Sequence, residues 1–189
     1  MTETLMRSAA LAGVAAAVAL APRAACAGDA KPFTAHAGED LARSAAVAWA
    51  DDAKLVWVEN DEDVSEAGDA ARWGYLFYSP SRDAARSYSI ENGEIRQAND
   101  LSFSFPAPPL EAPWVDSSQA LAAAEDEAGA KFRRENAGRV RSMLLVRGVL
   151  RPDAPDDATW AVVYESSSVP GLWVVVDASS GKVVRTWRG

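Results

Sequence analysis

The chain has 189 residues, a net charge of −8 at pH 7, one histidine and one cysteine. This length suits one ordinary domain or two small units. The acidic balance argues against nucleic acid or an anionic membrane as a partner, because phosphate recognition needs clustered Lys and Arg side chains. A zinc site built from three or four N or S ligands is excluded, and there is no Gly-rich phosphate loop, so no cofactor is expected.

The N-terminus has the pattern of an export signal. Arg7 precedes an apolar run over residues 8–21. That run is as long as the roughly 7–15 apolar residues of a signal peptide and shorter than the about 20 that span a bilayer. Ala25-Cys26-Ala27 then offers the small residues that a signal peptidase requires. We therefore expect residues 1–27 to be a signal peptide, no membrane span, and a periplasmic or secreted protein that begins at Gly28.

The only cysteine lies at this processing site, and two outcomes are open. Cleavage after Ala27 would remove Cys26. Alternatively, Cys26 becomes a lipidated N-terminus, but a lipobox favours an aliphatic residue where Arg23 stands, so cleavage after Ala27 is the favoured interpretation. In both cases no disulfide forms within the chain, and stability must come from the hydrophobic core.

A lead-in and a first folded unit follow. Residues 28–38 are polar and contain proline, which indicates a flexible lead-in. From Glu39 apolar residues recur at three- and four-residue steps, which predicts a helix. Four strands are then expected, the last two joined by the hairpin signal Asn92-Gly93. The first unit spans 39–105, with strands at 54–59, 72–78 and 86–91 and a fourth from residue 94.

Prolines separate this unit from a second one. Residues 106–115 contain four prolines and predict a stiff connector, because each proline fixes φ and removes a backbone donor. Asp116 or Ser117 can cap a helix that runs to about Asn136. The second unit spans 116–189, with strands at 139–150, 160–165, 172–177 and 182–187.

The two units repeat the same order of elements. At an offset of about 87 residues, Trp73 falls on Trp160, and the Asn92-Gly93 turn falls close to Ser180-Gly181. The sequence therefore predicts an α+β fold of two tandem helix–four-strand units, an antiparallel sheet with helices packed on it. Under this interpretation Trp73 and Trp160 are both buried beneath helices.

The end of the chain resembles the PepSY domain. Residues 160–164 (WAVVY), 172–178 (LWVVVDA) and 180–184 (SGKVV) look like the last strands of that family and its V-D-A-x-T-G-x-V turn. Residues 89–95 (SIENGEI) are a degraded form of the same turn in the first unit. The resemblance implies a non-enzymatic envelope module that binds or restrains a peptidase, and it transfers no catalytic residue.

The first acidic loop, residues 59–69, has the spacing that begins a calcium loop. Asp61, Asp63 and Ser65 stand at i, i+2 and i+4. The glycine required at the sixth position is replaced by Glu66, and the glutamate required at the twelfth position is also missing. A solvated acidic loop is therefore favoured over a metal site.

Carboxylates at the ends of elements leave an enzyme as an alternative. Glu165 and Asp177 end neighbouring strands, and Asp51-Asp52 follows the first helix. A carboxylate-dependent hydrolase needs two such groups in a pocket that separates their pKa values, and nothing in the sequence indicates one. A structural or ligand-storage protein of the envelope is the other alternative.

The favoured function is a non-catalytic exported envelope module that binds a protein or peptide partner. Acidic loops at 59–69 and 151–157 lie between equivalent strands, so we expect them at related edges, where they would steer a basic partner. The strand 172–177 is apolar on both faces, which indicates a sandwiched strand or an exposed binding surface. The candidate partner-binding residues are therefore Asp61, Glu62, Asp63, Asp156, Asp157 and Trp173.

Overall fold

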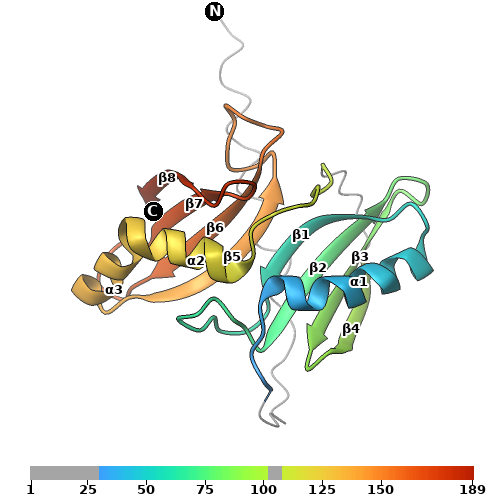
Figure 1. Cartoon of the computed structure of the whole chain (residues 1–189), viewed down its shortest axis with the longest axis horizontal. Helices are drawn as coiled ribbons and strands as arrows, with labels where there is room; N and C mark the ends of the chain where they lie inside the picture. The colour runs from blue at the N-terminus through green and yellow to red at the C-terminus, as the bar shows by residue number, and fades with distance from the viewer. Residues whose placement is uncertain (1–29, 102–107) are drawn as a thin grey trace, which may run out of the picture.

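A computed structural model of the chain describes residues 30–101 and 108–189 (Figure 1). The predicted signal peptide, its cleavage site and Cys26 lie outside the described residues, as does the start of the predicted proline connector. Within the described ranges, no helix is both long and apolar enough to cross a membrane.

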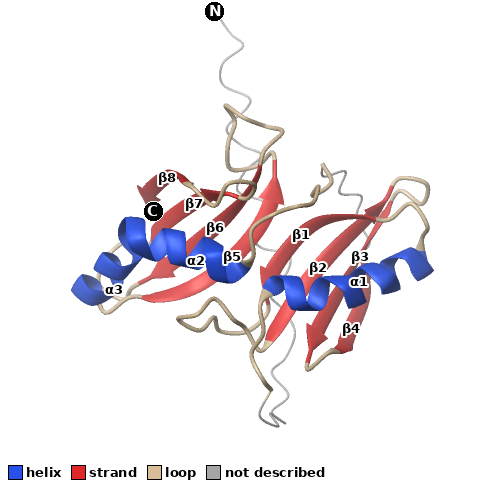
Figure 2. Cartoon of the chain, in the orientation of Figure 1, coloured by secondary structure: helices blue, strands red, loops and turns tan. Residues whose placement is uncertain are grey.

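Helices lie on one face of an antiparallel sheet (Figure 2). The first helix, α1, spans Ala35–Trp49. The second is interrupted by a π-helical turn, and its parts are α2 (Ser117–Ala124), η1 (Glu125–Gly129) and α3 (Ala130–Asn136). The strands are β1 (Lys54–Asn60), β2 (Arg72–Ser79), β3 (Ala84–Glu91), β4 (Glu94–Leu101), β5 (Arg139–Arg147), β6 (Ala158–Glu165), β7 (Leu172–Asp177) and β8 (Val183–Arg188).

The described strands form one continuous sheet in the order β4-β3-β2-β1-β5-β6-β7-β8. At its centre β1 and β5 pair antiparallel, with Trp57 opposite Val146. The predicted fold of two tandem helix–four-strand units is therefore wrong, because residues 30–101 and 108–189 form a single eight-stranded antiparallel sheet, mostly strand, with two helices, the second interrupted by η1. The pairing of β1 with β5 satisfies backbone groups that two separate sheets would leave as open edges.

The antiparallel hairpins predicted from the turn signals are confirmed. β2 pairs with β3 and β7 pairs with β8, both antiparallel. Asn92 and Gly93 join β3 to β4 with φ of 53° and 73°, which is the backbone that a two-residue hairpin turn with a matching twist needs. The strand predicted to run to residue 150 ends earlier, because β5 stops at Arg147. The next residue, Gly148, turns the chain with φ of 75°.

The N-terminal end of α1 is fixed more firmly than the predicted lead-in implies. The helix begins at Ala35, before the predicted start at Glu39. Just upstream, Phe33 and Ala70 exchange backbone hydrogen bonds of 3.0 Å in both directions. Residues 33–38 therefore belong to the folded part of the chain, and His36 lies in a helix instead of a flexible segment.

The core lies between the helices and the sheet. Trp73 of β2 and Trp160 of β6 are fully buried there, as predicted, with ring centroids 6.1 Å apart in an edge-to-face arrangement. Each indole donates a hydrogen bond of 2.7 Å to a backbone carbonyl, Trp73 to Phe33 and Trp160 to Val115. Both carbonyls belong to segments that lead into a helix, so the two tryptophans tie the helices to the sheet.

Each helix approaches the sheet closely at one glycine. A side chain at Gly38 of α1 would meet the Tyr75 hydroxyl oxygen at 2.5 Å, and a side chain at Gly129 of η1 would collide with the Tyr164 hydroxyl. Tyr75 and Tyr164 are both fully buried. Glycine is therefore required at both positions because a tyrosine occupies the space of the missing Cβ.

The N-termini of α1 and α2 meet at one carboxylate. Asp116 Oδ1 accepts hydrogen bonds from the backbone N–H groups of His36 (3.0 Å) and Ser117 (2.7 Å). Asp116 also forms a capping box with Gln119, and Ser117 Oγ accepts from Ala35 N at 3.0 Å. The first N–H groups of a helix have no partner within the helix, so this one cluster satisfies both helix ends.

Candidate partner-binding surfaces

The two acidic loops lie at opposite ends of the sheet (Figure 1). One connects β1 to β2 and contains Asp61, Glu62 and Asp63, and the other connects β5 to β6 and contains Asp156 and Asp157. Because β1 and β5 are antiparallel neighbours, their C-terminal ends point in opposite directions. The structure therefore does not bring the two predicted acidic groups together.

The acids of the β1–β2 loop are already engaged by the protein. Asp61 is exposed as a residue, but its carboxylate lies over Gly74 and accepts a hydrogen bond from Ser89. Glu62 pairs with Arg72 at 3.6 Å, and Asp63 pairs with Arg139 at 3.8 Å. In residues 30–101 and 108–189 there is no group of three His, Cys, Asp or Glu side chains placed to hold a metal ion.

Two neighbouring carboxylates at the end of β1, those of Glu59 and Asp61, have raised pKa values. Burial raises the pKa of Glu59, a hydrogen bond from Trp57 opposes the shift, and the charge of Asp61 adds to it. Burial also raises the pKa of Asp61, against the hydrogen bond from Ser89 and the charge of Arg72. The sequence analysis missed Glu59, because within the strand pattern nothing indicates that its carboxylate is buried.

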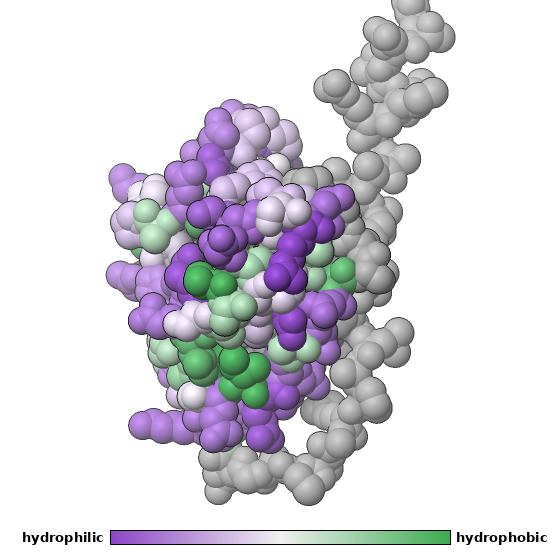
Figure 3. Space-filling model, turned by 90° about the vertical axis from the view of Figure 1, so that its right-hand side faces the viewer, coloured by the Kyte–Doolittle hydropathy of each residue, from purple (hydrophilic) through white to green (hydrophobic). Residues whose placement is uncertain are grey.

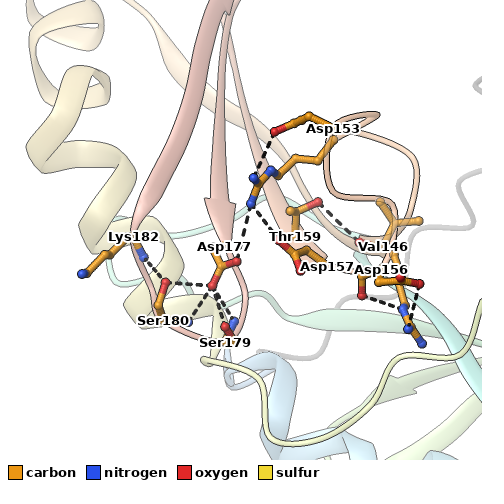
Figure 4. A network of polar contacts seen from close by, with 11 residues as sticks. Val146, Asp153, Asp156, Asp157, Thr159, Asp177, Ser179, Ser180 and Lys182 are labelled. Carbon is orange, nitrogen blue, oxygen red and sulfur yellow. Dashed lines mark hydrogen bonds and ion pairs between the residues drawn. The ribbon is translucent and has the colours of Figure 1, made fainter.

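The β5–β6 loop is held by two arginines, whose partners Asp153, Asp156 and Asp157 are labelled in Figure 4. Arg151 pairs with Asp157 at 2.8 Å and with Asp153 at 3.1 Å, and it approaches Asp177 at 3.9 Å. Arg147 pairs with Asp156 at 3.4 Å. The carboxylates of Asp156 and Asp157 therefore form ion pairs with arginines of β5 and of their own loop. These pairs reduce the negative charge available to a basic partner.

Asp177 organises the turn between β7 and β8 (Figure 4). Its Oδ1 accepts hydrogen bonds from the backbone N–H and the hydroxyl of both Ser179 and Ser180, at 2.7 to 3.1 Å. Burial alone would raise the pKa of Asp177, but these hydrogen bonds outweigh it and lower the pKa. Gly181, with φ of 70°, completes the turn. These residues therefore build the β7–β8 hairpin.

The carboxylates singled out as a hydrolytic pair are far apart. Asp177 of β7 lies opposite Thr159, near the N-terminal end of β6. Glu165 is the last residue of β6, at its C-terminal end. Six residues of extended strand separate these positions by roughly 20 Å. Glu165 pairs with Arg139 at 2.5 Å. The distance is about twice the widest carboxylate separation that glycosidases use.

The Asp51-Asp52 pair has a structural explanation. Asp52 accepts hydrogen bonds from Ser79 Oγ at 2.5 Å and from Ser81 N at 2.7 Å. The hydrogen bond from Ser79 is the main cause that lowers the pKa of Asp52. Asp51 is exposed at the end of the helix. Asp52 therefore fixes the β2–β3 turn against the end of α1.

A small pocket adjoins the β5–β6 loop. It has a volume of about 150 Å³, and its lining includes Glu111, Trp114, Arg147, Asp156 and Asp177. Typical small-molecule sites enclose roughly 300–1,000 Å³ and are mostly apolar. This pocket is smaller and lined by paired charges, so it does not have the features of a substrate cleft.

A wider hollow lies beside α3. It has a volume of about 400 Å³ and is lined by Glu66, Ala130, Arg133, Arg134 and Gly138. Arg133 is engaged there, because it pairs at 2.8 Å with both Glu66 and Glu125. The arginine thus links the β1–β2 loop to the second helix.

The face of the sheet opposite the helices carries aromatic residues. Trp173 of β7 and Trp187 of β8 lie opposite each other and stack with ring centroids 5.4 Å apart and an interplanar angle of 14°. The guanidinium of Arg185 lies 5.0 Å from the Trp187 ring centroid. Trp57 of β1 is on the same face, since strand side chains alternate between faces. The sequence analysis chose Trp173 as a partner-binding residue but did not choose Trp187 or Arg185.

On the side of the molecule that carries α1, β3 and β4, the apolar areas are small. Figure 3 views the side on which α1, β3 and β4 lie, and hydrophobic residues there form small groups among hydrophilic ones. Val47 of α1 is 52% exposed and Ile95 of β4 is 39% exposed. Scattered residues of this kind are ordinary for a protein surface. The stacked tryptophans are therefore the more distinctive candidate for a binding surface.

Comparison with known proteins finds a similar fold and no family. No protein-family model matches the chain. No curated protein matches it either. A crystal structure at 1.85 Å of a protein from Clostridium difficile 630, described as a putative lipoprotein, is similar with a TM-score of 0.54 and 13% identity. The match covers 78% of this chain and 90% of that chain, and at this identity it concerns the fold alone.

Proposed function

We propose that the protein is a non-catalytic exported envelope module that binds a protein or peptide partner. The observation that carries the proposal is the Trp173–Trp187 stack on the helix-free face of the sheet. Both residues are partly exposed. Tryptophan is enriched among the residues that dominate binding energy, because a large rigid ring buries much area at little entropic cost.

Export is supported by two independent features. The first is the pattern of residues 1–27, which reads as a signal peptide with cleavage before Gly28 or lipidation at Cys26. The second is the fold shared with a protein described as a putative lipoprotein. A lipid anchor would hold the folded part near a membrane, whereas cleavage would release it into the periplasm or medium.

The resemblance to the PepSY domain suggests that the partner is a peptidase. In that case the module would restrain the enzyme and would itself turn nothing over. The carboxylates considered for hydrolysis are engaged in turns and ion pairs, which agrees with this proposal. A general acid or base would instead need a pocket that leaves its carboxylate free to exchange a proton.

The proposal is tested by capture of a partner from an envelope extract of the source organism, followed by titration with the purified partner. Trp173→Ala should weaken binding by about 30-fold, the effect of a hot-spot residue. Val47→Ala, at an exposed apolar residue of α1, is the matched control and should bind as the unchanged chain does. Circular dichroism checks that both variants fold.

Two results would contradict the proposal. One is a partner whose affinity is the same for the unchanged chain and for Trp173→Ala. The other is turnover in peptidase, glycosidase or esterase assays that disappears with Glu59→Gln or Asp61→Asn, the two carboxylates with raised pKa values.

A further inference from the structure

The last strand is a basic edge of the sheet. Among the described strands, β8 is the last in the sheet order and pairs with β7. Residues 178–189 contain Lys182, Arg185 and Arg188 and no Asp or Glu, although the whole chain has a net charge of −8. Positive charge is therefore concentrated on one edge of an acidic protein.

These cations are not neutralised by acidic side chains, although Arg188 donates a hydrogen bond to the Pro170 carbonyl at 3.4 Å. Within the part of the chain that the structure describes, none of the three forms an ion pair, whereas Arg147 and Arg151 of the neighbouring loop each pair with at least two acids. Arg185 lies over the Trp187 ring, and Arg188 lies 4.4 Å from the ring centroid of Phe132. Stacking on an aromatic ring orients a guanidinium without neutralising it.

The backbone of β8 also has outward-facing hydrogen-bonding groups. Gly189 N donates to Gly171 O at 3.1 Å. In an antiparallel ladder, hydrogen-bonded and non-hydrogen-bonded pairs alternate, so Trp187 and Arg185 direct their backbone groups toward β7. The N–H and C=O groups of Thr186 and Arg188 then point away from the sheet, where another strand can pair with them.

We propose that β8 receives an extended acidic segment of the partner as an added strand of the sheet. This inference rests on the proposed function and names the surface and the chemistry of its partner. Backbone groups of Thr186 and Arg188 would pair with the segment, and Lys182, Arg185 and Arg188 would pair with its carboxylates. On the helix-free face, the Trp187 ring offers an apolar contact to alternate side chains of the segment.

An extended peptide fits this edge better than an anionic lipid surface. Membrane-surface residues insert aromatic side chains among headgroups. Here the Trp173 and Trp187 rings stack on each other and are only partly exposed. A row of outward backbone donors and acceptors matches another strand, which a lipid headgroup cannot supply.

The test uses the full chain and an eight-residue peptide of alternating Glu and Val. Binding is followed by the NMR signals of backbone amides. The amides of Thr186 and Arg188 should shift and exchange more slowly with solvent, and the affinity should fall as salt is raised. The double variant R185E/R188E should lose about tenfold or more in affinity. Lys131→Glu, at an exposed cation of α3, is the matched control and should bind as before.

Three further probes separate the alternatives. A Glu–Val peptide with alternate amides N-methylated keeps its charge but cannot pair as a strand, so equal binding would overturn strand addition. Equal binding of a Lys–Val peptide would overturn the acidic preference. Binding of anionic phosphatidylglycerol vesicles through β8, with no peptide binding, would assign the edge to a membrane instead, and self-association through β8 would assign it to a second copy.

Failure of this inference is distinguishable from failure of the proposed function. A captured partner that depends on Trp173 but binds R185E/R188E as tightly as the unchanged chain would leave the binding module in place and reject β8 as its site. Turnover of a substrate, or a partner indifferent to both sets of variants, would reject the proposed function itself.

Discussion

At the scale of single residues, two buried tyrosines occupy similar places but differ in their hydroxyl groups. The Tyr75 hydroxyl donates to the backbone carbonyl of Ala35 at 2.6 Å. The Tyr164 hydroxyl lies against Gly129 and makes no hydrogen bond of ordinary geometry among the described residues, although the Glu125 carboxylate is close enough to raise its pKa. The nearby carboxylate of Glu125 is engaged by Arg133. Burial raises the pKa of both phenols, so both stay neutral at physiological pH.

This difference predicts unequal effects of the same substitution. Tyr75→Phe removes a buried hydrogen bond and should lower the free energy of unfolding by about 0.5–1.5 kcal/mol. Tyr164→Phe removes a hydroxyl that makes no hydrogen bond of ordinary geometry, and its effect should be clearly smaller or slightly stabilising. Urea unfolding of both variants measures the difference. An equal or larger loss for Tyr164→Phe would show that its hydroxyl has a partner.

The acidic candidates show what residue types alone can predict. The positions of Asp156 and Asp157 in a loop were predictable, because the segment is polar and rich in proline and aspartate. Their pairing with Arg147 and Arg151 was not, since ion pairs depend on how the loop folds back on the end of β5. The same holds for Asp61, whose place over Gly74 depends on the pairing of β1 with β2.

At the scale of elements, Asp116 makes the stability of α1 depend on α2. Asp116→Ala leaves the N–H groups of His36 and Ser117 without their acceptor and should lower the free energy of unfolding by about 1–2 kcal/mol. Asp116→Asn keeps a capping oxygen and should lose clearly less. Asp40→Ala, an exposed acid of α1, is the control. Thermal unfolding followed by circular dichroism compares the three, and equal losses for Ala and Asn would contradict the capping role.

Helix and strand periodicity predicted the existence of most elements better than their ends. The segment 117–136 was predicted as one helix, and the structure has it interrupted by η1. The π-helical turn lies where Gly129 meets Tyr164, a contact between residues that are 35 positions apart in the chain. Local periodicity carries no information on such a contact, and π-turns are local adjustments inside helices.

At the scale of the whole molecule, the error in the predicted fold comes from one pairing. The repeated order of elements suggested two units, and the sequence between residues 60 and 139 contains nothing that predicts β1 beside β5. In the structure Val58 of β1 lies opposite Leu145 of β5, and both are fully buried. Pairing between strands distant in sequence is decided by tertiary packing, which a single sequence does not reveal.

The continuous sheet predicts that the described part of the chain unfolds as one cooperative unit. Leu145→Ala at the β1–β5 seam should lower the free energy of unfolding by about 2–5 kcal/mol, because it removes buried volume next to both halves of the core. The transition should move to lower temperature without splitting, and the calorimetric and van't Hoff enthalpies should agree, as in two-state unfolding. Tryptophan fluorescence should report the same midpoint as circular dichroism, because Trp73 and Trp160 are in edge-to-face contact across the seam. Two separate transitions, with Leu145→Ala shifting only one, would show that β1 and β5 join two independently stable parts.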